Sequence, residues 1–233
     1  NEEQHRHTVD VSLSDRALRE IYLPAFKAAV TEGGAWSLMG SYNKYRGTYA
    51  CHNHRLLVEI LKQEWGFDGA VISDWGGVHS TEEAIHNGLD MEFGTWTDGL
   101  REGASNAYDN YYMALPYLKL IESGEVGTEE LDDKVRRVLR LTFRTAMNND
   151  KPYGAMCSEA HSLAARQIAE EGIVLLKNHN NNLPIAPDAK RILVVGENAI
   201  KMMTVGGGSS SLKVKYECSP LDGIRNYYGD DVE

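Results

Sequence analysis

The chain has 233 residues, of which 42% are hydrophobic and 25% charged, a composition typical of a globular protein. Its 34 acidic and 24 basic residues give a formal net charge of -10, which argues against binding nucleic acid or an anionic membrane through a basic face. No apolar run reaches the roughly 18 residues of a membrane-spanning helix. Cys51, Cys157 and Cys218 have neither CxxC nor zinc-type spacing, so they indicate no disulfide framework and no metal site.

The first half of the chain alternates predicted helices with short apolar runs. Apolar positions from Ser14 to Val30 recur at helical spacing, and Gly33 follows as a stop. Residues 35–41 are predicted to form a buried strand, residues 55–65 an amphipathic helix, and residues 69–73 a second buried strand. Strand, helix and strand with short joints predict a parallel sheet with right-handed crossovers.

The same rhythm continues up to about residue 147. Residues 80–87 begin with a capping-box pattern, Ser80 with Glu83, and predict another helix. A third short strand is predicted at 89–92. Helices at about 105–123 and 128–147 complete this half of the chain.

A polar segment from Asn148 to Ser158 interrupts the pattern, and we place a domain boundary there. An Ala-rich helix is predicted from 158 to 172. Strands are predicted at 173–176 and, in the run RILVVG, at 191–196. A second α/β unit therefore begins after the boundary, with too few elements to complete it.

The segment 69–77, GAVISDWGG, carries the strongest indication of function. A buried strand here ends in a carboxylate and an indole, Asp74 and Trp75, before the chain turns through two glycines. Catalytic groups of (β/α)8 barrels lie where the strands end at their carboxyl face, and this pattern puts Asp74 at such an end. A glycosidase needs its nucleophile on a rigid element, because it must meet the anomeric carbon along a fixed line. The pattern alone equally allows Asp74 to cap the turn and Trp75 to pack between helix and sheet.

Ordered motifs in both halves resemble family 3 glycoside hydrolases. Those of the first half match the later part of the family's barrel: LREIYLPAFKAAVTEGGAWSLMGSYN (18–43), CHN (51–53), EWGFDGAVISDW (64–75) and GLDMEFG (88–94). Those of the second half match the opening of its α/β sandwich domain: ARQIAEEGIVLLKN (165–178), ILVVGENA (192–199), GGGSS (206–210) and PLDGI (220–224). The resemblance covers essentially the whole chain.

The resemblance implies roles for four residues of the first half. The Asp of the SDW motif is the family's catalytic nucleophile, here Asp74, and the adjacent Trp, here Trp75, borders the first sugar subsite. The family's Met and Tyr at the end of the preceding barrel strand match Met39 and Tyr42. In relatives the Tyr hydroxyl lies close to the nucleophile, so Tyr42 is expected to hydrogen-bond Asp74 and help to keep it ionised. The alternative for Met39 is a flexible core filler.

Two further segments carry weaker expectations. Ser209 and Ser210 belong to a glycine-rich loop that reaches toward the sugar site in two-domain relatives, and the alternative is a flexible linker. Arg6 would lie just past the family's sugar-binding Lys-His motif. It is either a brace behind the site or part of a solvated charged segment.

The resemblance also indicates what these residues lack. The family's sugar-binding Asp, Arg and Lys-His residues would precede Asn1. The sequence begins neither with Met nor with a signal-peptide pattern. The general acid/base, a Glu of the second domain in two-domain relatives, would follow the last residue. We interpret the other carboxylates near Asp74 structurally, as first-turn helix charges or strand-end groups: Glu82, Glu83, Asp90 and Glu92.

We therefore predict an α/β fold with the C-terminal part of a (β/α)8 barrel in residues 1–147, a linker in 148–157 and the start of an α/β sandwich in 158–233. About three barrel strands are counted where a barrel closes with eight, so the remainder of the parent chain, or another chain, must cover the open edges. A homo-oligomer is one such possibility.

The resemblance implies retaining hydrolysis of terminal β-linked glucosides or oligosaccharides through a covalent glycosyl-enzyme on Asp74, with no cofactor and no metal. The segment alone is expected to be inactive, and a periplasmic or secreted location is favoured for the parent enzyme. One alternative is a non-catalytic carbohydrate-binding or inactive fragment. Another is a nucleotide-binding α/β protein, suggested by RILVVG and the later glycine-rich run.

Overall fold

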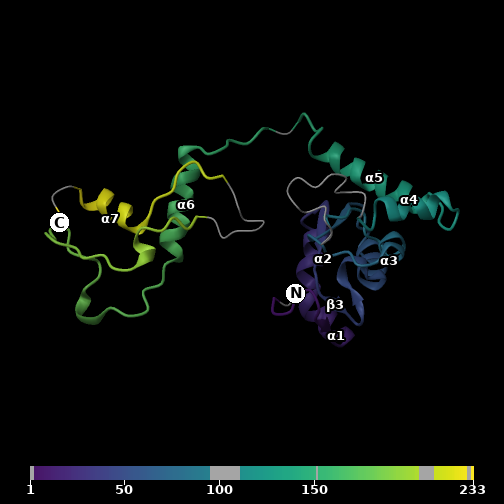
Figure 1. The fold of residues 1–233 in the computed structure, drawn as a ribbon, viewed down its shortest axis with the longest axis horizontal. Coiled ribbons are helices and arrows are strands. Elements are labelled where there is room, and N and C mark those ends of the chain that lie inside the picture. Colours follow the sequence, from purple (N-terminus) through teal and green to yellow (C-terminus); the bar gives the residue numbers. More distant parts are fainter. Residues whose placement is uncertain (1–2, 95–110, 151, 205–212, 230–231) are drawn as a thin grey trace. The chain divides into compact units, whose positions relative to one another are not determined.

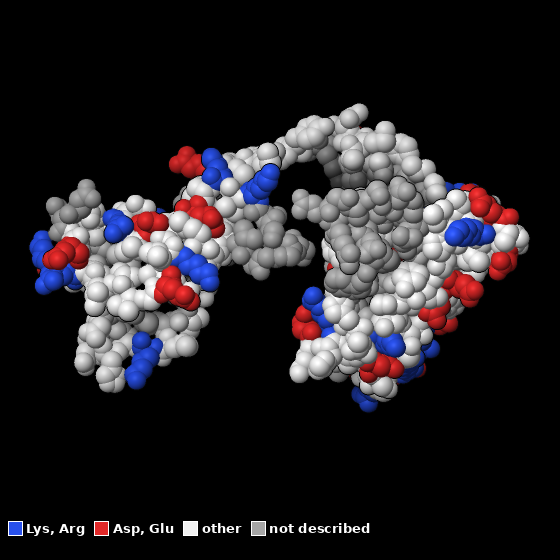
Figure 2. Space-filling model, in the orientation of Figure 1, with Lys and Arg blue, Asp and Glu red and all other residues white. Residues whose placement is uncertain are grey.

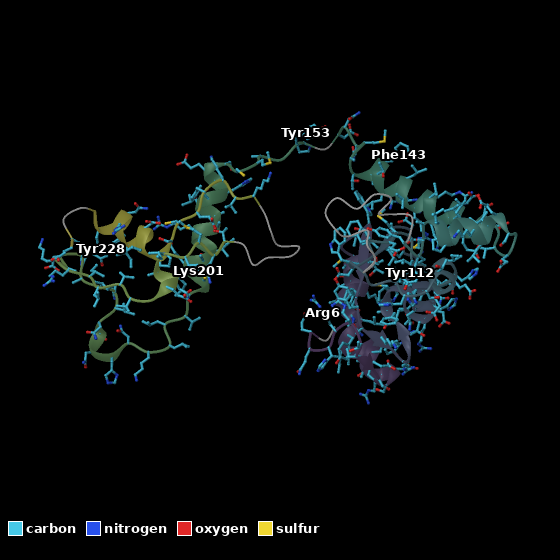
Figure 3. The ribbon with its side chains drawn as sticks, viewed as in Figure 1. Arg6, Tyr112, Phe143, Tyr153, Lys201 and Tyr228 are labelled. Carbon is cyan, nitrogen blue, oxygen red and sulfur yellow. The ribbon has the colours of Figure 1, made fainter. Side chains whose placement is uncertain are left out.

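The computed structural model describes residues 3–94, 111–150, 152–204, 213–229 and 232–233. The chain divides into two compact units, Asn1–Lys151 and Pro152–Glu233 (Figure 1). The division falls inside the polar segment 148–157, where Tyr153 is fully exposed (Figure 3). Each unit is described by itself below.

The first unit has an α/β fold built on two parallel strands. Strand β2 (Ser37–Gly40) pairs with β5 (Ala70–Ser73) in a register that sets Ser37 opposite Ala70 and Gly40 opposite Ser73. The connection runs through η3 (Arg55–Glu64), a π-helical segment that is followed by Gly66 with a positive φ of 67°. The strand–helix–strand unit predicted from the sequence is therefore confirmed.

The third strand predicted at 89–92 is reduced to one parallel bridge between Ile72 and Met91. Backbone hydrogen bonds nevertheless continue the sheet at this point, because Ser73 N donates to Met91 O at 2.9 Å and Met91 N donates to Val71 O at 3.0 Å. The carboxyl end of β5 thus has a neighbouring segment on both sides.

The core of the first unit lies on β5 and the helices that cover it. Val71 is 1% exposed and Leu89 is fully buried. The buried cluster comprises Leu57, Leu61, Phe67, Val71, Val78, Ala84 and Leu89. The burial predicted for β2 is wrong, since Met39 is 61% exposed and Ser37 is also exposed. One face of β2 has no covering layer among the described residues.

A small second sheet replaces the loop expected after β2. Its strands are β1 (Asp10–Val11), β3 (Lys44–Tyr45) and β4 (Thr48–Tyr49), with β3 parallel to β1 and antiparallel to β4. Arg46 and Gly47 join β3 to β4 with φ values of 52° and 87°. Positive φ at both positions is what a type I′ hairpin turn requires, and the sequence Arg-Gly is a weaker signal for it than Asn-Gly.

The helix predicted from Ser14 to Val30 consists of three consecutive pieces: α1 (Asp15–Ala17), the π-helical η1 (Leu18–Tyr22) and α2 (Pro24–Thr31). Ser14 Oγ accepts a hydrogen bond from Ala17 N at 3.1 Å and caps the first piece. The break lies at Leu23, directly before Pro24, because proline has no N–H for the helical ladder.

Helix α3 (Thr81–His86) begins with half of the expected capping box. Ser80 Oγ accepts from Glu83 N at 3.2 Å, but the Glu83 carboxylate lies 2.6 Å from Nδ1 of the buried His52 instead of returning to the cap. A long-range contact has therefore replaced a local one.

Helices α4 (Leu115–Glu122) and α5 (Glu129–Arg144) follow, both within the predicted helical ranges. Figure 1 shows them together at one end of the first unit, with α1 and β3 at the other. The ammonium of Lys134 on α5 reaches the end of α3 and donates to Ile85 O at 2.8 Å and Leu89 O at 2.7 Å. This cation satisfies carbonyls that a helix end leaves without partners.

A buried ion pair ties η3 to the amino end of β5. Lys62 Nζ donates to Asp90 Oδ1 at 2.7 Å, and Val71 N donates to Asp90 Oδ2 at 2.7 Å. The Asp90 side chain has no exposed surface. Because both oxygens are engaged, the carboxylate holds strand and helix together.

The second unit contains α6 (Glu159–Gly172), α7 (Pro220–Tyr228) and two short 3₁₀ turns, η5 (His179–Asn181) and η6 (Glu197–Ala199). The predicted helix from Ser158 is confirmed as α6, with Ser158 as its N-cap. Helix α7 begins with a complete capping box between Ser219 and Asp222.

The strands predicted at 173–176 and 191–196 do not form, and the described part of this unit has no strand ladder. Most of their side chains are exposed, with Val174 at 74% and Leu193 at 89%, whereas Ile192 and Val194 are half-buried. Among the described residues of this unit, ladder-like hydrogen bonds run from Ile192 N to Glu233 O at 2.8 Å and from Glu233 N to Lys190 O at 2.9 Å. An apolar run becomes a strand only where a neighbouring strand satisfies its backbone.

We predict that Asp90→Ala lowers the free energy of unfolding of the first unit by about 3–5 kcal/mol, because it leaves the buried Lys62 and the Val71 amide without their partner. Denaturant unfolding followed by tryptophan fluorescence would measure the loss. The matched control is Asp132→Ala, since Asp132 makes an exposed pair with Arg136 at 3.7 Å. That change should cost about 0–1 kcal/mol. Equal losses in the two variants would contradict the role given to Asp90.

Candidate functional site

Three of the residues singled out by the sequence lie around one cavity in the first unit. Asp74 directly follows β5, and Tyr42 follows the end of the paired strand β2 by two residues. Because parallel strands present their carboxyl ends at the same edge, the pairing brings these two residues together. Asp74, Tyr42 and Met39 border a cavity of about 360 Å³.

Asp74 sits in a tight turn fixed from two sides. Its Oδ1 accepts a hydrogen bond from Trp75 N at 2.7 Å, and its carbonyl accepts from Gly77 N at 3.0 Å. Gly76, with a φ of 70°, donates its N–H to Phe93 O at 3.1 Å. Capping of the turn, which is the structural alternative for Asp74, therefore accounts for one of its two carboxylate oxygens, Oδ1.

Tyr42 is 8% exposed and interacts with the Asp74 carboxylate. Burial, then a hydrogen bond with Asp74 and the charge of that carboxylate, raise the pKa of Tyr42 to about 12. The guanidinium of Arg6 lies 5.0 Å from the centre of the Tyr42 ring and acts on the pKa in the opposite direction. The phenol thus stays protonated and can donate to the carboxylate at neutral pH.

Arg6 belongs to the surroundings of the site and not to a freely solvated segment. Besides its position over the Tyr42 ring, its Nη1 donates to Glu3 Oε2 at 3.0 Å. Arg6 lines the same cavity as Asp74. Its contact is with the tyrosine, which fits a brace.

Trp75 is 44% exposed and does not pack between helix and sheet. Its ring stacks on Phe93 with centroids 4.9 Å apart and an interplanar angle of 21°. Phe93 is held in turn by its own N–H, which donates to Ser73 Oγ at 2.8 Å. Sequence reasoning missed Phe93, although its place in GLDMEFG, after the segment that bridges to β5, was a usable signal.

In the part of the chain that the structure describes, Met39 is exposed, so it does not fill a core there. Ser209 and Ser210 lie outside the residues that the structure describes. A further residue was missed by sequence reasoning: Cys51, in η2 (Ala50–His52), is fully buried and contacts both strand ends at the site.

The other carboxylates near Asp74 in sequence have structural positions, and three of them make defined contacts: Glu83, Asp90 and Glu92. Glu82 and Glu83 lie in the first turn of α3, as interpreted from the sequence. Glu92 Oε2 accepts from Met113 N at 2.7 Å, and burial raises the pKa of Glu92. Asp90 is engaged by Lys62 and Val71.

Within the described ranges no cluster of three or more His, Cys, Asp or Glu side chains is arranged to hold a metal ion. On the face seen in Figure 2, Lys and Arg are interspersed with Asp and Glu. No helix in the part of the chain that the structure describes is both long and apolar enough to cross a membrane.

Comparison with known proteins gives matches over both halves of the chain. Residues 1–141 match the glycosyl hydrolase family 3 N terminal domain, and residues 173–232 match the glycosyl hydrolase family 3 C-terminal domain. The chain is 54% identical, over its whole length, to the beta-glucosidase BoGH3A of Bacteroides ovatus, of which it covers 32%. It therefore spans about a third of the length of that relative.

Solved structures are similar over the same extent. DesR, a beta-glucosidase from Streptomyces venezuelae solved in complex with D-glucose, matches with a TM-score of 0.81 and 29% identity over 100% of this chain and 30% of that protein. Beta-glucosidase 3B from Thermotoga neapolitana, in complex with glycerol, matches with a TM-score of 0.76 and 31% identity over 98% of this chain and 31% of that protein.

We predict that the absorbance difference between the wild-type protein and Tyr42→Phe on alkaline titration has its midpoint near pH 12, because Tyr42 is buried beside the Asp74 carboxylate. In Asp74→Asn the midpoint should move part of the way toward 10, since burial contributes more to the shift than Asp74 does. The direction of this pKa shift also determines how Tyr42 affects stability as the pH changes. A raised pKa in the folded state means that Tyr42 stabilises fully below pH 10 and that this contribution is lost as the pH rises through about 12. A midpoint at 10 in the wild type would contradict the contact.

Proposed function

Because the chain belongs to glycosyl hydrolase family 3, we propose that it carries the nucleophile side of a retaining β-glucosidase active site. The observation that supports this most directly is the meeting of Asp74 and Tyr42 at the carboxyl ends of two paired parallel strands, beside the exposed ring of Trp75. Its relatives named above are beta-glucosidases, and one was solved with D-glucose. The substrate class that follows is a terminal β-linked glucoside or oligosaccharide.

In this mechanism the Asp74 carboxylate attacks the anomeric carbon as the bond to the leaving oxygen breaks, and a covalent glycosyl-enzyme forms. Tyr42 donates a hydrogen bond to this carboxylate before the attack. A second carboxyl group about 5–5.5 Å away protonates the leaving oxygen and then takes a proton from the water that releases the sugar. The step needs neither metal nor cofactor.

The acid/base is proposed to be a Glu outside these 233 residues. Three of the other carboxylates near Asp74 have partners: Glu83 contacts His52, Glu92 accepts from Met113, and Asp90 is paired with Lys62. A general acid must lie within reach of the leaving oxygen, and neither these three nor Glu82 borders the cavity that Asp74 lines. The chain alone is accordingly proposed to be inactive.

We further propose that residues 1–147 form the C-terminal part of a (β/α)8 barrel, 148–157 a linker and 158–233 the start of an α/β sandwich. The parallel pairing of β2 with β5, and the bridge from β5 to Met91, support the barrel assignment. The exposed face of β2 and the unpaired apolar runs of the second unit support a need for more chain. The remainder of the parent chain is the proposed cover, and a second copy is the other candidate.

Trp75 is proposed to form one wall of the sugar subsite. Since Phe93 covers one face of its ring, the opposite face is the one available to the apolar side of a pyranose. Met39 borders the cavity that Asp74 and Tyr42 line, whose lining does not include Trp75, and is a second proposed contact. Ser209 and Ser210 are carried as proposed contacts on the resemblance alone.

The rival functions have less support. A purely carbohydrate-binding fragment gives no role to the contact of Tyr42 with Asp74. A nucleotide site would need RILVVG to be a strand that leads into a phosphate-binding turn, and residues 191–196 are not a strand.

We predict that Asp74→Asn, in the whole protein, lowers kcat for an aryl β-glucoside by about four to six orders of magnitude, as removal of a catalytic nucleophile does. A fluorinated glucoside that traps the glycosyl-enzyme should label Asp74, and peptide mass spectrometry would locate the label. The matched control is Asp132→Asn, an exposed residue on α5. Labelling at another carboxylate, with normal turnover in Asp74→Asn, would exclude this nucleophile.

We predict that Trp75→Ala weakens glucose binding by about 1–3 kcal/mol, since a large apolar contact is lost, while Asp74 is still labelled. The inhibition constant for glucose measures the effect. Trp75→Phe should retain part of the binding energy, and Phe143→Ala, which removes an exposed aromatic ring on α5, should change nothing (Figure 3). A lower melting temperature with unchanged glucose inhibition would make Trp75 a packing residue.

A further inference from the structure

Cys51 differs from the other two cysteines of the chain in its surroundings. All three are free thiols, but Cys157 and Cys218 are exposed whereas Cys51 has no exposed surface. It lies in the short turn η2, which packs against β2 of the β2–β5 pair. No step of the mechanism above uses it.

The Cys51 thiol connects the ends of the two strands that carry the site. Its Sγ donates to Ser41 O at 3.3 Å, at the end of β2. The backbone N–H of Asp74, directly after β5, is close enough to the same sulfur to act on the pKa of the thiol, which it lowers. One atom therefore lies against the residue before Tyr42 and against the nucleophile itself.

Two glycines make room for this sulfur. A Cβ atom on Gly40 would lie 2.8 Å from Cys51 Sγ, and one on Gly77 would lie 2.9 Å from it. Neither glycine has a positive φ, so backbone conformation does not require glycine at these positions. Instead, glycine is required because the thiol occupies the space that a Cβ atom would take. The thiol therefore packs closely against both strand ends.

We infer that Cys51 is a positioning residue that sets the separation of Tyr42 and Asp74, through its hydrogen bond to Ser41 O and its close packing against Gly40 and Gly77 at the two strand ends. The placement of Tyr42 and Asp74 by Cys51 is inferred from geometry alone. Its effect on catalysis rests on the proposed function. Small displacements matter here because the nucleophile must approach the anomeric carbon along a fixed line.

A thiol suits this place better than a charged or larger group. Burial and the nearby Asp74 carboxylate raise the pKa of Cys51 to about 11, so the group remains a neutral donor at neutral pH. No second negative charge forms beside the nucleophile. A serine hydroxyl could contact the same two strand ends, but it is smaller than the thiol. The strand ends would therefore have to move closer together.

The test compares Cys51→Ala, Cys51→Ser and the matched control Cys218→Ala in the whole protein. Cys51→Ala should lower both kcat and the rate at which a fluorinated glucoside labels Asp74 by about 10- to 100-fold, with little change in KM. Cys51→Ser should recover part of the rate. The alkaline titration midpoint of Tyr42 should also fall from about 12 toward 10 in Cys51→Ala, by more than the loss of the Cys51 charge accounts for, since that charge is the smallest of the contributions that raise the pKa of Tyr42. Cys218→Ala should match the wild type in every measurement.

A double-mutant cycle with Gly77→Ala sharpens the test. The added methyl would press on the thiol, so Gly77→Ala should be defective alone and less defective when combined with Cys51→Ala. Wild-type labelling and Tyr42 titration in Cys51→Ala, whatever its melting temperature, would overturn the inference, as would strictly additive effects in the cycle. If Cys51→Ala does not fold, Cys51→Ser decides by the same readouts. If Asp74→Asn remains active, the proposed function fails, and the Tyr42 titration still tests the placement by Cys51.

Discussion

The parallel pairing of β2 with β5 is the constraint on which the rest of the site depends. Its register sets Gly40 opposite Ser73, so the residues that follow each strand leave the sheet at the same edge. Tyr42 and Asp74 meet for this reason, and burial together with this contact raises the pKa of Tyr42 to about 12. A slip of one residue would turn the side chains of one strand to the opposite face and separate the pair.

The two ends of β5 are held by different kinds of interaction. At the amino end, the buried Asp90 accepts from Val71 N and pairs with Lys62, which ties the strand to η3. At the carboxyl end the contacts are neutral and short-ranged: the thiol of Cys51, the amide of Gly76 on Phe93 O, and the ring stack of Trp75 with Phe93. The buried ion pair that ties the strand to η3 thus lies at the opposite end of β5 from the carboxylate proposed to react.

The two units differ in how far their sequence patterns become structure. In the first, a buried run such as 70–73 finds a partner strand and becomes β5. In the second, equally apolar runs at 173–176 and 191–196 stay unpaired and exposed. The difference lies in the partner and not in the run, because a strand gains its stability from backbone hydrogen bonds to a neighbour and from burial of its face.

Local patterns in the sequence determined the helices, the order of β2, η3 and β5, and the position of Asp74 and Trp75 after a buried strand, because spacing, caps and turn residues act within a few positions of the chain. The Met39 and Tyr42 assignments came from the family resemblance. Only the tertiary structure decided which groups meet across long stretches: Cys51 between the strand ends, Phe93 on Trp75, and Glu83 on His52 in place of its helix cap. It also decided that the apolar runs of the second unit remain without partners. Such contacts depend on residues tens of positions apart, and no local pattern records which of them the folded chain brings together.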